Sequence, residues 1–362
     1  MQAAWFCYAK QACSRGPCFR HLVVLDDEVC WLTITAPEPA TIGIVAIGRN
    51  EGARLEQCLR SLLSQSPAVI YADSASSDGS ADLARRLGVE TVELPGDQPL
   101  SAAAGRAAGF ARLRATFPNI ELVQFVDGDC LLNPDWLSTA TTFLKSNSRA
   151  AVVCGRRFEA EPEASIYNAM CDAEWDTPVG QAQACGGDAL FRVDAYEAVG
   201  GFNAGLLAGE EPELCGRLRA QGWEIWRIAA KMTEHDARML HFGQYWRRSL
   251  RGGLGYAQVW NQSRKSGDAL YGRQLASALA WTIGLPLAVM VIALLLRQPA
   301  ILALITIAYL AQWLRITGKI GSDRPHRPGQ AALTLLAKVP ETLGAARYVL
   351  RATRPSAARS GS

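Results

Sequence analysis

Apolar and polar residues form short alternating blocks from residue 41 onward. Residues 41–47 are a β-branched apolar run that predicts a buried strand, and residues 50–64 carry leucines at helical spacing. The pattern then repeats, predicting strands at 68–72, 90–94 and 121–126 and helices at 80–87 and 102–116. Strands that alternate with helices indicate an α/β fold with a parallel core, in which ligands bind at the carboxyl ends of the strands.

The pattern changes after residue 240. Residues 276–296 hold no charged side chain, and a helix of this length crosses about 30 Å of hydrocarbon. After an interruption at 297–299, residues 300–314 form a second uncharged stretch. We therefore predict a C-terminal transmembrane helical hairpin, with a buried hairpin of a soluble core as the alternative.

Basic residues flank both outer ends of this hairpin, and only Arg297 lies in its connection. The flanking residues are Arg264, Lys265, Arg273, Arg315, Lys319, Arg324 and Arg327. Because cytoplasmic flanks carry the excess of Lys and Arg, we predict attachment to the inner (cytoplasmic) membrane with the α/β domain facing the cytoplasm. Residues 244–262 mix aromatic residues with arginines and predict an interfacial helix in contact with membrane lipids. Residues 331–350 predict a second one, interrupted by Pro340.

Composition sets the broad class. The chain has 362 residues, 49% of them apolar, and its net charge of +3 is too small to indicate nucleic acid as a partner. None of the ten cysteines form a Cys-x2-Cys pair, so the usual zinc spacing is absent and we expect reduced thiols. Residues 1–40 resemble neither a signal peptide nor a core element. The predicted organisation is an extension (1–40), a catalytic domain (41–240), an interfacial segment (241–275), the hairpin (276–314) and a basic cytosolic tail with an amphipathic helix (315–362).

Two aspartates one residue apart, Asp127 and Asp129, follow the predicted strand at 121–126. Such carboxylates can share one divalent cation, which usually binds through one or two carboxylates plus substrate phosphates. Gly128 between them leaves room for those phosphates. A polar turn also explains Asp-Gly-Asp, but Asp73 falls at the end of another strand, which favours a site at this edge of the sheet.

Several motifs along residues 41–250 belong together. They are Arg49-Asn50-Glu51-Gly52, Asp73 with the Ser- and Asp-rich loop after it, Gly105-Arg106, Asp127-Gly128-Asp129, Cys185-Gly186-Gly187-Asp188 and Gly209-Glu210-Glu211. As an ordered set they resemble the family 2 inverting glycosyltransferases. The resemblance implies the GT-A fold, a Rossmann-like α/β domain of nucleotide-diphospho-sugar transferases.

The resemblance also implies a donor site and a metal site. The residues implied in donor binding are Asn50, Glu51, Asp73, Arg106 and Asp127. Asp73 would accept the N–H of a uracil-like base, so a UDP-sugar is the expected donor. Asp127 and Asp129, with His235, would hold Mg²⁺ or Mn²⁺ against its diphosphate. An exposed helix arginine and a satisfied loop histidine are the alternatives for Arg106 and His235.

On the acceptor side, Gly186, Gly187 and Asp188 resemble the family's acceptor wall, where glycines allow a sugar to approach the backbone. Gln244 and Arg247 resemble the start of the Gln-x-x-Arg-Trp motif of processive synthases. Arg248 replaces the tryptophan, which puts processivity in doubt.

An inverting transfer needs one carboxylate to take the proton of the acceptor hydroxyl. Glu210-Glu211 resembles the family's Glu-Asp motif at a helix N-terminus, with Glu211 in the place of the base and Glu210 as its acidic neighbour. Because Glu replaces Asp, the assignment between the two stays open. A helix N-terminus also favours acidic residues for electrostatic reasons alone.

The sequence therefore predicts a membrane-associated glycosyltransferase of hexosyltransferase type, which moves a sugar from a nucleotide-diphospho-sugar to a hydroxyl of a lipid-linked or envelope glycan acceptor. A nucleotidyltransferase of similar fold and a catalytically inactive membrane scaffold are the alternatives. The short loop Gly48–Gly52 lacks the Gly-rich, basic character expected of a nucleotidyltransferase. The intact acidic positions disfavour the scaffold.

Overall fold

The structure is a computed structural model that describes residues 18–25, 28–35, 41–96, 100–264, 269–322 and 324–352. The chain separates into two compact units, Met1–Ala40 and Thr41–Ser362. Parts of the predicted extension and of the basic tail, and also Lys265, lie outside the described residues.

The first unit contains a β-hairpin where the sequence predicted no regular element. Strands β1 (Cys18–Leu25) and β2 (Glu28–Thr35) pair antiparallel, with Leu25 opposite Glu28. Both strands are rich in β-branched and other apolar residues, the composition of a pleated sheet. This signal was present in the sequence, but the polar residues around it obscured it.

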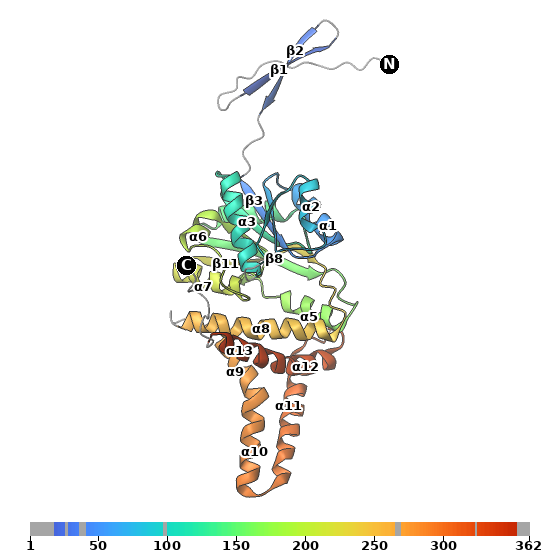
Figure 1. Cartoon of the computed structure of the whole chain (residues 1–362), viewed down its shortest axis with the longest axis vertical. Coiled ribbons are helices and arrows are strands. Elements are labelled where there is room, and N and C mark those ends of the chain that lie inside the picture. The colour runs from blue at the N-terminus through green and yellow to red at the C-terminus, as the bar shows by residue number, and fades with distance from the viewer. Residues whose placement is uncertain are drawn as a thin grey trace, which may run out of the picture. The chain divides into compact units, whose positions relative to one another are not determined.

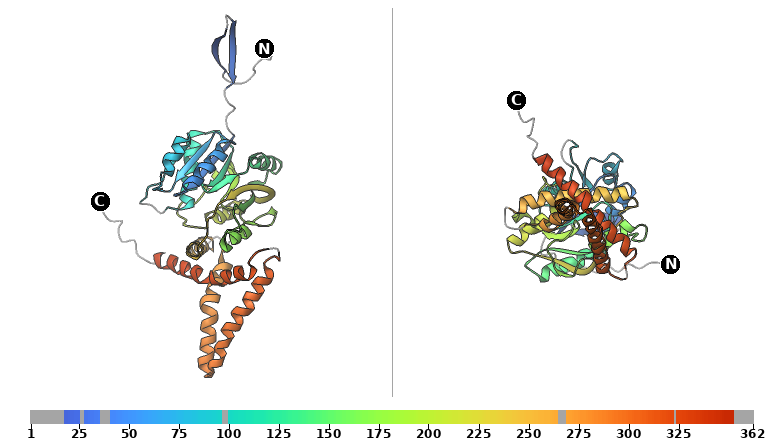
Figure 2. Two further views of the ribbon diagram at one scale, coloured as in Figure 1. Left: turned by 90° about the vertical axis from the view of Figure 1, so that its right-hand side faces the viewer. Right: turned by 90° about the horizontal axis from the view of Figure 1, so that it is seen from below.

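The second unit is built on a mixed sheet, seen in Figures 1 and 2. Its parallel part has the order β5-β4-β3-β6 and consists of β3 (Ile42–Gly48), β4 (Val69–Asp73), β5 (Glu90–Glu93) and β6 (Leu122–Asp127). The sheet continues through β10 (Ala189–Arg192), β8 (Ala150–Glu159), β11 (Glu224–His235) and β7 (Cys130–Leu132), with β9 (Gly180–Gln181) paired to β11. The predicted α/β fold with a parallel core is confirmed.

Seven helices connect the strands within residues 41–96 and 100–235. They are α1 (Ala53–Leu63), α2 (Ser80–Arg86), α3 (Ala102–Thr116), α4 (Trp136–Ser146), α5 (Ile166–Trp175), α6 (Val193–Ala198) and α7 (Glu210–Ala220). Helix α3 coincides with its predicted range. Its first residue follows Ser101, whose side chain caps the helix by accepting from the Ala104 amide at 3.1 Å. It packs closely on β3, since a Cβ at Gly109 would lie 2.4 Å from the Val45 side chain.

The C-terminal part is helical. Its elements are α8 (Phe242–Ser263), α9 (Gly272–Leu279), a π-helical turn (Ala280–Gly284), α10 (Leu285–Leu296), a 3₁₀ turn (Pro299–Leu302), α11 (Ala303–Lys319), α12 (Arg327–Leu336) and α13 (Lys338–Ala352). Helices α8, α12 and α13 form a layer between the α/β domain and the hairpin of α10 and α11 (Figure 1). Pro340 lies in the first turn of α13, where its missing N–H costs no helical hydrogen bond. The predicted interruption therefore falls three residues earlier, at Ala337.

Two continuous helices, Gly272–Leu296 and Pro299–Lys319, are long and apolar enough to cross a membrane. Only 11% and 0% of their most apolar windows are buried. Neither is therefore a core helix of the described chain.

Helices α8 and α13 cross with their backbones in contact. A Cβ at Gly253 would lie 1.9 Å from the Glu341 carbonyl oxygen, and a Cβ at Gly344 would lie 2.1 Å from that of Leu250. Small residues at a crossing allow this approach. The layer beside the catalytic domain is therefore tightly joined.

Candidate active site

The candidate site lies at the carboxyl ends of β3, β4 and β6. The turn after β6 is anchored because the Gly128 amide donates to the Ile47 carbonyl oxygen at 2.7 Å. A Cβ at Gly128 would lie 3.0 Å from that oxygen, so a glycine fits best between Asp127 and Asp129. The end of β6 is thus pressed against the end of β3.

The loops after β3 and β4 are tied to each other through Asn50, which adopts φ +58°. Its side-chain oxygen accepts from the Ser77 amide at 2.8 Å, and its own amide donates to Ser76 Oγ at 2.9 Å. Glu51 pairs with Arg54 at 2.7 Å. Burial and the charge of Asp129 raise the pKa of Glu51. Both predicted donor residues therefore lie at the edge where the strands end.

Asp73 lies at the end of β4 and is almost fully buried. One of its oxygens accepts from the Tyr71 hydroxyl at 3.0 Å and the other from the Ser76 amide at 2.7 Å. These bonds shape the loop. Both oxygens of Asp73 already have hydrogen-bond partners in the protein. Contact of Asp73 with a nucleotide base stays a prediction.

Arg106 holds two acidic parts of the site together. Its guanidinium, 2% exposed, pairs with Asp127 at 2.7 Å and with Glu210 at 2.6 Å. Burial alone would lower the pKa of Arg106, but the charges of Asp127, Glu210 and Asp188 raise it above its ordinary value. Arg106 is therefore not the exposed helix residue that was its alternative. Gly187 makes this possible, because a Cβ there would lie 2.6 Å from Arg106 Nη2.

Asp188 lies beneath Asp127 and not on an open acceptor wall. Its Oδ1 accepts from the Asp127 amide at 3.0 Å and its Oδ2 from the Thr233 hydroxyl at 2.7 Å. Its side chain is fully buried. The sequence suggested an acceptor contact from its place in a motif, but the hydrogen bond to Thr233 turns the carboxylate inward.

Asp129 faces His235, which extends from the last position of β11. Asp129 Oδ2 lies 3.3 Å from His235 Nε2, and His235 Nδ1 lies 3.2 Å from a Glu159 oxygen. Burial raises the pKa of Asp129, but the hydrogen bond and charge of His235 outweigh it and bring the pKa to about 2. Asp129, Cys130 and His235 offer donor atoms within 4.8 Å of one another.

The two glutamates at the start of α7 have different surroundings. Glu210 pairs with Arg106, whereas Glu211 is buried behind the loop at 185–187 and accepts hydrogen bonds from the Cys185 amide and, at 3.3 Å, from the Cys215 thiol. Burial raises the pKa of Glu211. Only Glu210 is neutralised directly by a cation.

Gln244 and Arg247 are part of the start of α8. The Gln244 side chain accepts from the Leu240 and His241 amides at 2.9 Å each and donates to the Arg238 carbonyl oxygen. Gln244 therefore caps α8, and Arg247 is exposed. Neither residue makes a hydrogen bond or ion pair with Asp127 or Glu210 within the described part of the chain, so their acceptor role stays a prediction.

Comparison with known proteins agrees with this geometry. Residues 44–197 match the family described as Glycosyl transferase family 2. Residues 44–197 are a family 2 glycosyltransferase domain. Comparison with curated protein sequences gave no match.

Several solved structures resemble this glycosyltransferase. The mannosyltransferase PcManGT from Pyrobaculum calidifontis, in complex with GDP-Man and Mn²⁺, has a TM-score of 0.56 at 17% identity over 85% of this chain and 89% of its own. S. aureus TarS 1-349 has a TM-score of 0.45 at 11% identity, with 87% and 93% of the two chains covered. Glucosyl-3-phosphoglycerate synthase from Mycobacterium tuberculosis has a TM-score of 0.42 at 16% identity, with 61% and 79% covered.

Arg157 of this glycosyltransferase also belongs to the site, although its sequence position did not predict it. Its guanidinium pairs with Asp127 at 3.2 Å and with Asp188 at 3.5 Å. The Cζ atom of Arg157 lies 4.7 Å from the centroid of the Trp175 ring. The Nε atoms of Arg106 and Arg157 are buried without a hydrogen-bond partner among the described residues. Two unsatisfied N–H donors beside Asp127 suit an anionic ligand. The signal available in the sequence was the pair Arg156-Arg157 near the end of strand β8.

Proposed function

We propose that this glycosyltransferase is membrane-attached, depends on Mg²⁺ or Mn²⁺, and moves a sugar from a nucleotide-diphospho-sugar to an acceptor hydroxyl with inversion. The observation that carries the proposal is the group of Asp127, Asp129 and His235 at the end of β6, faced by the buried guanidiniums of Arg106 and Arg157. It combines ligands for a cation with donors for a diphosphate. PcManGT, which has the same fold, was solved with GDP-Man and Mn²⁺, and this supports the same donor class here.

The donor atoms fit such a cation. Carboxylate oxygens suit Mg²⁺ and Mn²⁺, and an imidazole nitrogen is tolerated by Mn²⁺. Asp129 and His235 would hold the ion, with Asp127 joining them once it is released from Arg106 or Arg157. The bound ion would offset the charge that builds on the departing nucleoside diphosphate.

Glu211 is our proposal for the base. Its carboxylate is buried and its pKa is raised, which suits a proton acceptor near neutral pH. Glu210 is less suited, because Arg106 holds its oxygen at 2.6 Å. Glu210 instead positions Arg106.

We further propose that the hairpin of α10 and α11 crosses the inner membrane with the catalytic domain on its cytoplasmic side. The support is the exposure of the two apolar helices and the basic residues at their outer ends. A lipid-linked or envelope glycan acceptor follows from this location.

The test is turnover of a panel of UDP- and GDP-sugars by the full-length protein in detergent, with Mn²⁺ or with chelator. We expect metal-dependent release of nucleoside diphosphate from one donor, and loss of this release in Asp129→Asn. A folded protein that turns over no donor, with or without membrane lipid extract as acceptor, would instead support the inactive scaffold.

A further inference from the structure

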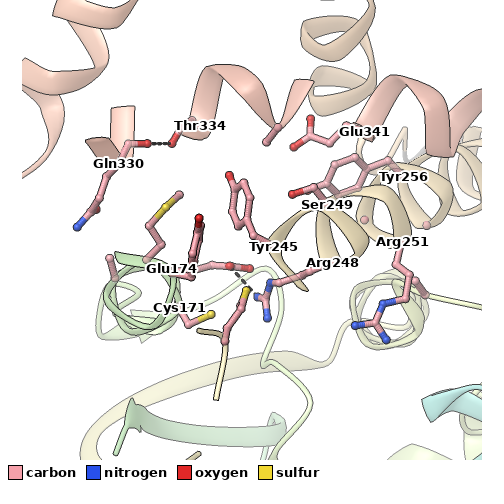
Figure 3. Close-up of a pocket in the computed structure, with 18 of the residues that line it drawn as sticks. Cys171, Glu174, Tyr245, Arg248, Ser249, Arg251, Tyr256, Gln330, Thr334 and Glu341 are labelled. Atoms are coloured by element: carbon pink, nitrogen blue, oxygen red, sulfur yellow. Dashed lines mark hydrogen bonds and ion pairs between the residues drawn. The ribbon is translucent and has the colours of Figure 1, made fainter. Parts of the chain in front are cut away.

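A cavity of about 680 Å³ lies between the catalytic domain and the helix layer. Figure 3 shows its polar walls. Arg248 and Arg251 come from α8, Glu174 and Cys171 from α5, Gln330 and Thr334 from α12. The cavity therefore joins elements far apart in the sequence.

The charges in this cavity are unequal. Glu174 pairs with Arg248 at 2.8 Å, and Glu341 pairs with Lys338 at 2.6 Å. The Arg251 side chain lines the cavity but is exposed, and it makes no hydrogen bond or ion pair in the described part of the chain. Partial desolvation and the charges of Arg248 and Arg247 lower its pKa. The cavity wall thus holds one cation without a partner beside two others of the same sign, and an anion is the ligand that would relieve this repulsion.

Part of the cavity wall is apolar. It includes Ile316 and Ile320, which lie near the end of the second candidate membrane helix. A free phosphate would use only the arginines. A phosphate carried on an apolar chain would use both the arginines and the apolar part of the wall.

The cavity also reaches the catalytic segment. Ala208 and Gly209 line it, and the next residue, Glu210, pairs with Arg106 of the active site. A ligand head bound at the arginines therefore lies against the segment that carries both candidate bases.

We propose that this cavity is the acceptor site and that it binds the phosphate head of a membrane lipid on Arg251 and Arg248, with the lipid chain leaving along α11. The acceptor hydroxyl would then be the P–OH group of this head: its oxygen bonds to the sugar as the bond between the sugar and the nucleoside diphosphate breaks, and its proton passes to the base. This inference rests on the proposed function and specifies its acceptor class.

The experiment measures the thermal midpoint of the full-length protein in neutral detergent micelles during titration with three probes. They are dioctanoyl phosphatidic acid, dioctanoylglycerol and inorganic phosphate. We expect only the first to raise the midpoint, because a ligand that binds the folded state stabilises it. Stabilisation by inorganic phosphate alone, at equal concentration, would overturn the lipid assignment in favour of a water-soluble phosphate.

The variants Arg251→Gln and Arg347→Gln each remove one exposed positive charge from the same helix layer, but Arg251 lines the cavity and Arg347, on α13, does not. Arg251→Gln should weaken phosphatidic acid binding by about tenfold or more, the scale of a lost charged hydrogen bond, and Arg347→Gln should not. Arg251→Lys should retain part of the binding, which separates charge loss from misfolding. Equal binding by Arg251→Gln and wild type overturns the proposal. Metal-dependent donor turnover without lipid is measured in parallel, so failure of lipid binding with turnover intact leaves the proposed function standing.

Discussion

Replacing Arg106 with methionine tests whether one buried guanidinium joins the donor side of the site to the catalytic helix. Met fills much of the same volume but leaves Asp127 and Glu210 without their shared cation. Asp127 keeps Arg157 at 3.2 Å, whereas Glu210, with 13% of its side chain exposed, has no other ion pair among the described residues. The cost therefore falls mainly on Glu210. Breaking a buried pair by removing one partner costs about 3–5 kcal/mol, and we take the lower end because Glu210 is partly exposed.

The assay is the apparent thermal midpoint of the full-length protein in detergent. About 3 kcal/mol corresponds to a fall of roughly 6 °C or more for a domain of this size. The matched control is Arg112→Met on the same helix, which loses only an exposed pair with Glu90 at 3.3 Å, worth less than about 1 kcal/mol. Adding Glu210→Gln to Arg106→Met should recover part of the loss. Equal midpoints for Arg106→Met and Arg112→Met would refute the reasoning.

Three further predictions concern the base and two close contacts. Glu211→Gln should cut transfer by about 10²-fold or more with donor binding unchanged, and the same effect in Glu210→Gln alone would exchange their roles. Because the pKa of Glu211 is raised, the kcat/KM of the wild type should fall as the pH drops through a value above the pKa of an ordinary Glu. A fall of kcat/KM at the ordinary pKa would contradict this. Gly187→Ala should weaken Mn²⁺-dependent nucleotide binding measured by calorimetry, since its Cβ would lie 2.6 Å from Arg106 Nη2; unchanged affinity would show that Arg106 adjusts freely. Gly253→Ala should destabilise the folded protein by about 1–3 kcal/mol, because its Cβ would force α8 away from α13. The control Gly252→Ala, whose Cβ would meet nothing closer than 3.8 Å, should not. Equal thermal unfolding midpoints for the two variants would mean that the crossing is not tight.

The sequence predicted the parallel half of the sheet well because each of its strands is a local, continuous apolar run. Buried strands such as β4, with all five residues buried, need no partner to be recognised. The hairpin at β1 and β2 was missed because its alternation is embedded in polar residues. The two apolar helices were predicted from hydropathy, and both extend beyond the predicted ranges, to Gly272 and to Lys319.

The candidate site was less predictable, because its bonds join distant positions. The pair Arg106–Glu210 spans 104 residues and the pair Glu159–His235 spans 76, and no spacing rule connects such residues. Motif position placed Asp188 on the acceptor wall, but its hydrogen bond to Thr233 on β11 turns it beneath Asp127. Side-chain direction depends on register across β8 and β11, which contains irregularities.

Helix α8 physically joins the α/β domain to the helix layer beside the two candidate membrane helices. On one face, Gly253 touches the α13 backbone; on another, a Cβ at Gly255 would lie 2.8 Å from Ala208. Gln258 accepts from the Leu207 amide and donates to the Gly205 carbonyl oxygen, at 3.0 Å each. The segment 205–209, which leads directly into Glu210, is therefore fixed by the same helix that fixes the layer beneath it. A displacement of α8 relative to α13 must move that segment or break both hydrogen bonds, so the positions of Glu210 and Glu211 depend on the packing of the helix layer.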